Sequence, residues 1–203
     1  MSLRSLWIML VLAAAGLAAL PVRADELADI EKLYHDGKVA EALALADATI
    51  SAQPRSAQVR FLKGMMLIEQ QRVDEALPVF IALTQDYPEL PDPFNNLGVL
   101  YASKGQWQNA LGALQSALRN DPEHRLALEN LGDLYLVLAQ QSWAAAQARS
   151  KGDDAELARK LRLAGEILPA ATPVRVLRPR TAPPVQLGSP FRRSQGLDST
   201  GGR

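Results

Sequence analysis

The chain holds few side chains of the kinds that carry out chemistry, and their spacing does not suit a reaction. The two histidines, His35 and His124, have no second histidine, cysteine or carboxylate at metal-ligand spacing. We therefore interpret both as exposed turn residues. The adjacent acids Asp153 and Asp154 follow Gly152, which favours a helix cap over an acid/base couple. The sequence contains no cysteine, serine-nucleophile turn or glycine-rich phosphate loop, so we predict a non-enzymatic chain with no cofactor and no metal.

Small and apolar residues recur instead at a fixed interval of about 34 residues, and a period of this length indicates a stack of helix pairs. Each such pair is too small to bury its own apolar face alone. The sequence therefore predicts an all-α fold. The residues in step are Ile30, Gly64, Gly98 and Gly132; Leu33, Leu67, Tyr101 and Tyr135; Ala42, Ala76, Ala110 and Ala144; and Pro54, Pro88 and Pro122.

The unit from 91 to 124 shows the pattern most clearly. Asp92 and Pro93 are typical of a helix start, with Asp as the cap and Pro at the first helical position. The first helix is predicted to end at 104–105. The second helix should end at 120–122, because the residue before a proline is pushed out of the helical region. Gly98 and Ala110 are predicted to face each other where the two helices approach closely. The other glycines that keep the interval, Gly132 among them, are interpreted as packing glycines.

The order of these residues resembles the tetratricopeptide repeat, over about 25–150. The resemblance implies a right-handed superhelical solenoid of antiparallel helix pairs, with three to four repeats at about 23–56, 57–90, 91–124 and 125–150. In the last unit Ala139 stands for the turn glycine and no proline follows. An amphipathic segment at 154–168, with Leu157, Leu161, Ala164 and Leu168 on one stripe, is predicted to be a cap helix. The pattern is carried in the third unit by Phe94, Leu97, Gly98, Tyr101, Gly105, Ala110, Leu114, Ala117 and Pro122.

The same resemblance implies a concave groove, lined by the first helix of each pair, that binds a protein or peptide partner. Its apolar and acidic character favours a basic, apolar segment, and the asparagines are expected to bond a peptide backbone. The alternative is that these residues are only solvated. The predicted groove residues are Phe61, Met65, Glu69, Asp92, Asn95, Asn96, Val99, Glu129, Asn130 and Asp133.

The segment 1–24 has the layout of a secretory signal peptide. Arg4 precedes an uncharged apolar run at 6–20, and Val22 and Ala24 provide small residues before a cleavage point. We expect a product that is soluble in a bacterial periplasm, without a membrane span after cleavage. The absence of cysteine excludes a lipoprotein. The alternative is an uncleaved anchor on a membrane-tethered structural protein that associates with itself.

Charge is distributed unevenly along the chain. Residues 25–168 carry 14 Lys and Arg against 21 Asp and Glu, whereas 169–203 carry six Arg against one Asp. An acidic body argues against a nucleic-acid partner. The Pro- and Arg-rich segment at 169–203 is predicted to be a disordered tail. Two hypotheses for it remain open: contact with the chain's own groove, or contact with an anionic envelope surface.

Overall fold

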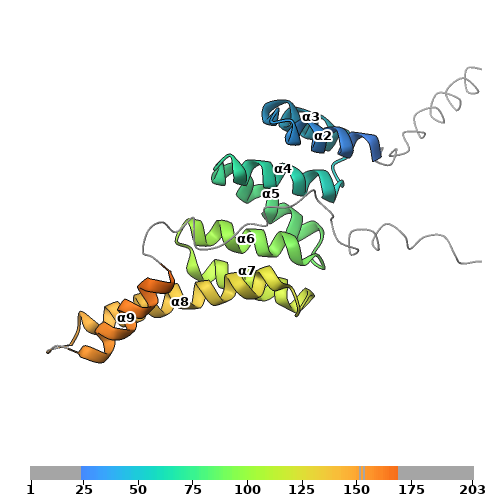
Figure 1. Cartoon of the computed structure of the whole chain (residues 1–203). Helices are drawn as coiled ribbons and strands as arrows, with labels where there is room; N and C mark the ends of the chain where they lie inside the picture. The colour runs from blue at the N-terminus through green and yellow to red at the C-terminus, as the bar shows by residue number, and fades with distance from the viewer. Residues whose placement is uncertain (1–23, 151, 153, 169–203) are drawn as a thin grey trace, which may run out of the picture. The chain divides into compact units, whose positions relative to one another are not determined.

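The computed structural model describes residues 24–150, 152 and 154–168, and in these residues the fold is all-α, as predicted (Figure 1). The predicted signal peptide, apart from Ala24, and the predicted Pro/Arg-rich tail lie outside the described residues. The fold divides into two compact units, Met1–Arg60 and Phe61–Arg203. The helices are α2 (Ala24–His35), α3 (Val39–Ala52), α4 (Ala57–Glu69), α5 (Val73–Asp86), α6 (Pro91–Ser103), α7 (Trp107–Asn120), α8 (Arg125–Gln147) and α9 (Ala155–Ile167).

The prolines that keep the interval end the second helix of each pair. Gln53, Tyr87 and Asp121 each stand directly before a proline and have φ between −141° and −134°, outside the helical region. The ring of the following proline disfavours helical geometry at these residues. Each donates its N–H to the carbonyl oxygen four residues back, at 2.8–2.9 Å, so the last turn stays closed.

Left-handed residues in the turns end the first helix of three pairs. Gly37 and Gly105 have φ of +75° and +69°, and Gln71 holds the same place with φ +57°. Glycine takes this conformation freely, whereas a side chain there costs about 1 kcal/mol or more. The second helix pair therefore forms the same turn although Gln71, and not a glycine, stands at the left-handed position.

Pairs of a small and a large residue hold the two helices of each pair together. A Cβ added at Gly64 would lie 2.6 Å from the Phe80 ring, and one at Gly98 would lie 2.7 Å from Leu114 Cγ. The predicted close approach of α6 and α7 at Gly98 is confirmed, with the Ala110 carbonyl oxygen 3.4 Å from the same point.

In the first helix pair, α2 and α3, the large residue and the small residue are exchanged between the two helices. Ile30 of α2 takes the glycine position and Ala46 of α3 takes the position of the large residue. Both are fully buried, and α2 packs on α3. The large residue thus moves to the other helix while the seam stays filled.

The start of α6 differs from the prediction. The cap is Leu90, with extended φ and ψ of −85° and 122°, and Pro91 is the first helical residue. Proline favours an extended residue before it and is itself suited to the first helical position, so Pro91 sets the boundary ahead of Asp92 and Pro93.

The fourth helix pair predicted for 125–150 is not formed. The chain does not turn near Ala139, and α8 runs without a break from Arg125 to Gln147. Alanine has the highest helix propensity, and five of the ten residues from 139 to 148 are alanine, with no glycine or proline among them. Nothing in this segment therefore stops the helix.

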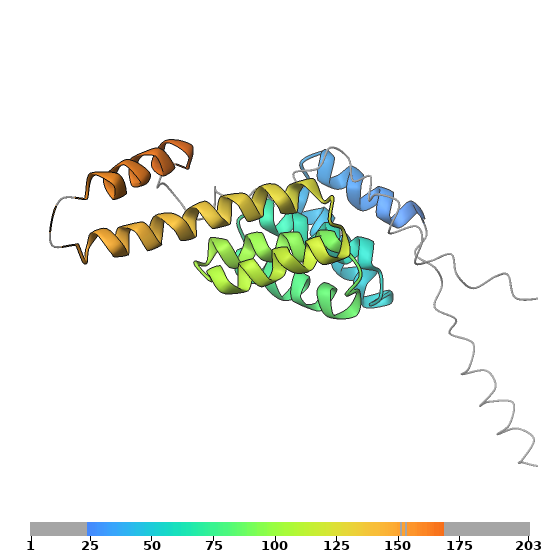
Figure 2. The same cartoon turned by 90° about the horizontal axis from the view of Figure 1, so that it is seen from below.

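The helix that follows, α9, folds back along the second half of α8 (Figure 2). Its cap is Asp154, whose Oδ1 accepts from the N–H groups of Glu156 and Leu157, each at 3.1 Å. Ala164 is buried, and the other members of its predicted stripe are half-buried. The stripe therefore lies against α8.

Without a turn in α8, one predicted packing glycine has nothing to pack against. A Cβ added at Gly132 would meet no atom within 4 Å, so the interpretation of Gly132 as a packing glycine is wrong. The helix that packs on Gly98 is α7, and the fourth unit provides no equivalent helix.

We expect substitution by alanine to have opposite effects at these two equivalent glycines. Gly98→Ala places a methyl group against Leu114 and should cost about 1–3 kcal/mol of unfolding free energy through overpacking. Gly132→Ala meets open space in a helix and should gain about 0.5–1 kcal/mol. Urea unfolding followed by circular dichroism measures both. Equal destabilisation by the two variants would contradict the assignment of α8.

Candidate peptide-binding face of the repeats

Six of the ten predicted groove residues do not present their side chains to solvent. Each of the six is at most 5% exposed. Phe61 stacks edge-on against Phe80, with ring centroids 5.6 Å apart, and Val99 belongs to the core formed by α6, α7 and α8. The six are Phe61, Met65, Asn95, Asn96, Val99 and Asn130.

The predicted stripe on α6 is the one that packs against α8. Asn130 Nδ2 of α8 donates to Asn95 Oδ1 of α6 at 2.8 Å, and Val99 lies one turn beyond Asn95 in the same core as Leu134. Helical periodicity identifies this stripe as inward-facing. Helical periodicity alone does not show whether such a stripe contacts the first helix of the next pair or lines an open surface.

Two amide atoms on this stripe lack a partner in the described structure. Asn96 Nδ2 donates to the backbone oxygen of Asp92 at 3.2 Å, but Asn96 Oδ1 is buried and accepts no hydrogen bond. Asn95 Nδ2 is also buried and donates none. Each such atom costs about 1–3 kcal/mol when it is left unsatisfied. Adjacent residues of α6 thus hold one free donor and one free acceptor.

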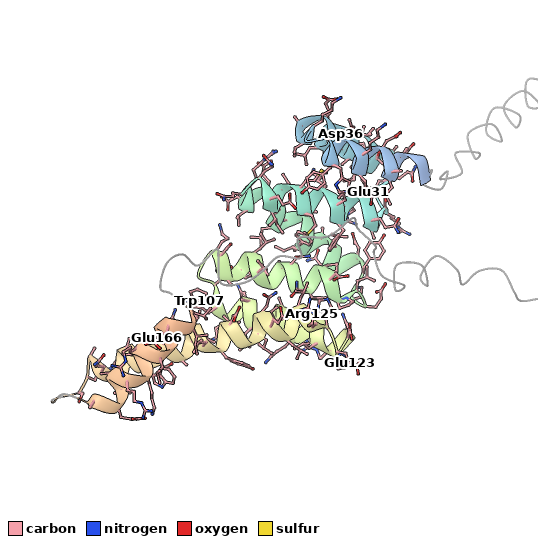
Figure 3. The ribbon with its side chains drawn as sticks, viewed as in Figure 1. Glu31, Asp36, Trp107, Glu123, Arg125 and Glu166 are labelled. Carbon is pink, nitrogen blue, oxygen red and sulfur yellow. The ribbon has the colours of Figure 1, made fainter. Side chains whose placement is uncertain are left out.

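Acidic side chains that keep some exposure flank this amide pair. Asp92 precedes Asn95 by three residues, and Glu129 and Asp133 lie on either side of Asn130 in α8. Glu129 is 43% exposed and accepts from Arg125 Nη1 at 2.7 Å, near the start of α8 where Figure 3 labels Arg125. Below we call Asp92, Glu129 and Asp133 the acidic face.

The fourth predicted acid, Glu69, lies at the end of α4. Burial raises the pKa of its carboxyl group above the ordinary value, because desolvation disfavours the charged form.

The interpretation of His124 as an exposed turn residue is wrong. Its side chain is 11% exposed, not an open turn residue. Nδ1 accepts from the N–H of Ala127 at 3.1 Å and so caps α8, which leaves the ring proton on Nε2, 3.0 Å from Asp92 Oδ1. The ring thereby joins the starts of α6 and α8. Histidine is not a usual capping residue, so its residue type does not predict a cap. The only sequence signal for the cap is the place of His124 directly before the predicted helix.

Two other kinds of site are absent from the described ranges. No group of three His, Asp or Glu residues there is arranged to hold a metal ion. None of the helices there is both long and apolar enough to cross a lipid bilayer.

Comparison with known families identifies the repeat. A family model described as tetratricopeptide repeat matches residues 33–91, and a second model with the same description matches residues 94–126. Residues 33–91 and 94–126 are tetratricopeptide repeats. The matched residues include the pairs α4–α5 and α6–α7, in which Gly64 and Gly98 form the close contacts.

Solved structures share the tetratricopeptide-repeat fold with this chain. MamA (residues 41 to the end) from Desulfovibrio magneticus RS-1 is 21% identical, with TM-score 0.53 over 71% of this chain and 76% of that one. A tetratricopeptide repeat protein from Parabacteroides merdae ATCC 43184 is 18% identical, with TM-score 0.53 over 70% and 59%. YrrB, described as a TPR protein with an unusual peptide-binding site, is 19% identical, with TM-score 0.52 over 78% and 82%. Curated protein sequences give no match.

Substitutions of His124 should separate its two contacts. His124→Ala removes the cap of α8 and the bond to Asp92, and should cost about 1–2 kcal/mol of unfolding free energy. His124→Asn keeps a good capping side chain but is too short to bridge to α6, so its cost should be smaller. Urea unfolding of the full chain compares the two. Equal costs would show that the bridge to Asp92 contributes nothing.

Proposed function

We propose that this tetratricopeptide-repeat protein is a non-enzymatic scaffold that binds a basic, apolar segment of another protein. The observation that carries the proposal is the free donor on Asn95 and the free acceptor on Asn96, beside the acidic face. A peptide backbone offers both complementary groups, a carbonyl oxygen and an N–H.

Binding in this mode needs a small rearrangement of α6. The side-chain amides of Asn95 and Asn96 turn toward the ligand. The peptide backbone then provides hydrogen-bond partners for the two amide atoms that have none in the free protein. Basic side chains of the ligand then face Asp92, Glu129 and Asp133. The peptide-binding site named for YrrB supports a peptide ligand for this fold, although that likeness concerns the fold alone.

The proposed site of action is outside the bacterial inner membrane. Support comes from the sequence pattern of the segment 1–24, and assembly or maturation of an envelope complex is the expected setting. The competing function is a membrane-tethered, self-associating protein, which the uncharged run at 6–20 favours if it is retained. A further part of the proposal is that the basic segment 173–180 of the chain competes with partners for the acidic face.

The mass of the native N-terminus separates these two locations. We expect the protein isolated from its own cells to begin at Asp25 and to be recovered in the periplasmic fraction. Intact-mass measurement after osmotic release provides the test. Recovery of a chain that begins at Met1, in the membrane fraction, would support the tethered alternative instead.

Binding of a basic probe tests the acidic face. A fluorescein-labelled peptide with the sequence of residues 173–180 should bind in anisotropy measurements, and the triple variant D92N, E129Q and D133N should bind about five- to twentyfold more weakly, as three partly exposed ion pairs predict.

The control for this experiment removes equal charge elsewhere. Glu41, Glu89 and Glu166 are exposed and belong to α3, the turn before α6, and α9. Their triple Gln variant should change the affinity less than twofold. A loss of the same size in both triple variants would mean that only net charge attracts the peptide, and the proposed face would be rejected.

A further inference from the structure

The large hydrophobic side chains that the described structure leaves exposed are confined to its last two helices. They are Leu128 and Tyr135 of α8, at 50% and 49% exposure, and Leu163 and Ile167 of α9, at 45% and 68%. An apolar surface at one end of a repeat array requires an explanation, because scattered single residues do not gather in this way.

The helical register places these four residues on one side of the α8–α9 pair. Leu136 and Gln140 are half-buried in α8, which packs on α9, and their helical spacing places them on one stripe that we take to face α9, because successive residues turn by about 100°. Leu128 and Tyr135 therefore lie to one side of the contact. The partner stripe on α9 includes Leu161 and Ala164.

Figure 2 shows that α9 runs antiparallel to α8. With this orientation, the helical register places Leu163 and Ile167 on the same side as Leu128 and Tyr135. With a rise of about 1.5 Å per residue from the connecting turn, Ile167 lies level with the middle of α8, beside Tyr135. We call Leu128, Gly132, Tyr135, Leu163 and Ile167 the open seam.

The preceding repeat shows what covers such a surface. One interval earlier, the positions of Leu128, Gly132 and Tyr135 are held by Phe94, Gly98 and Tyr101. There, Phe94 and Tyr101 pack against the core that α7 completes, and Leu114 of α7 occupies the space left by Gly98. At Gly132 the same space is open, since no atom lies within 4 Å of a Cβ placed there.

We propose that the open seam docks an amphipathic helix of another protein, in the position that a fourth second helix would take. The ligand helix carries a small residue and, four residues later, a leucine or phenylalanine, as α7 does with Ala110 and Leu114. The docking is independent of the acidic face and goes beyond the function proposed above.

Two other occupants fit the open seam less well. The chain's own segment 169–203 has prolines at 169, 173, 179, 183, 184 and 190, so it offers no amphipathic helix of the needed length. In a second copy, the side chain that would fill such a place is Leu114 of α7, which is already fully buried against that copy's own Gly98.

The chain itself supplies the probe. A peptide with the sequence of residues 106–121 carries α7, and a lactam between positions 108 and 112, both exposed in α7, holds it helical without touching the packing face. We expect this labelled peptide to bind the full chain in anisotropy measurements. The same peptide with Leu114→Ala should bind at least about tenfold more weakly, because the side chain that enters the glycine space is lost.

Variants of the protein locate the binding. Gly132→Leu fills the open space and should weaken the helical probe at least about tenfold without lowering the melting temperature, since nothing lies within 4 Å. Gly165→Leu is the matched control: Gly165 is also a helical glycine with open space, but the register places it on the other side of the pair. Binding of the basic peptide to the acidic face should be unchanged by both variants.

Four results would overturn the proposal. The first is absence of binding by the helical probe. The second is equal binding of the probe to the wild type and to Gly132→Leu. The third is a dimer in light scattering that Gly132→Leu dissociates and the probe does not, which would assign the open seam to a second copy. Leu128→Asp provides a second variant at an exposed position, and probe binding that survives this change would also contradict the proposal.

Discussion

The close contact between a small residue on one helix and a large residue on its partner is the constraint on which the rest of the structure depends. Gly98 admits Leu114, and Gly64 admits Phe80, at distances that a methyl group on either glycine would make impossible without movement. The exchange of sizes at Ile30 and Ala46 shows that the filled volume matters, not the residue type at either position. An extra or missing group here costs about 1–5 kcal/mol, which is comparable with the stability of a small domain. The constant repeat interval follows, because each turn must return the second helix to this contact.

The same constraint explains why the structure changes character at α8. The repeat signal of the fourth unit is complete in its first half, through Leu128, Gly132 and Tyr135. In its second half Ala144 keeps the interval, but the turn glycine and the closing proline are missing. The alanine-rich continuation of α8 extends past Ala139, where the turn was expected, and α9 packs against the second half of the helix. The glycine is left without the side chain it would accommodate. Its helix-destabilising effect is offset by no internal contact, which is the physical reason to look for an external one.

Much of the fold could be predicted from the sequence, whereas little of the candidate site could. Helix ends depend on local chemistry, such as the residues before Pro54, Pro88 and Pro122, and local chemistry is visible in one sequence. The continuity of α8 was missed because a missing turn glycine is weak evidence: Gln71 also lacks glycine, yet it adopts the left-handed turn. The burial of Asn95, Asn96 and Asn130 could not be predicted, because buried and open-face positions of a helix share the same spacing. Their polar type indicated a surface, but a buried bond between Asn95 and Asn130 satisfies part of that polarity inside the structure.

The two proposed binding surfaces meet on α8 without overlapping. Leu128 and Gly132 of the open seam form one i, i+4 stripe of α8, and Glu129 and Asp133 of the acidic face form the adjoining stripe. The first surface is polar, carries unsatisfied amides and suits an extended basic peptide; the second is apolar, carries an empty glycine space and suits a helix. Charge screening weakens the first and leaves the second unaffected, because only the first depends on ion pairs. On these two proposals, α8, which packs against α6 and α7 and also against α9, contributes side chains to both surfaces.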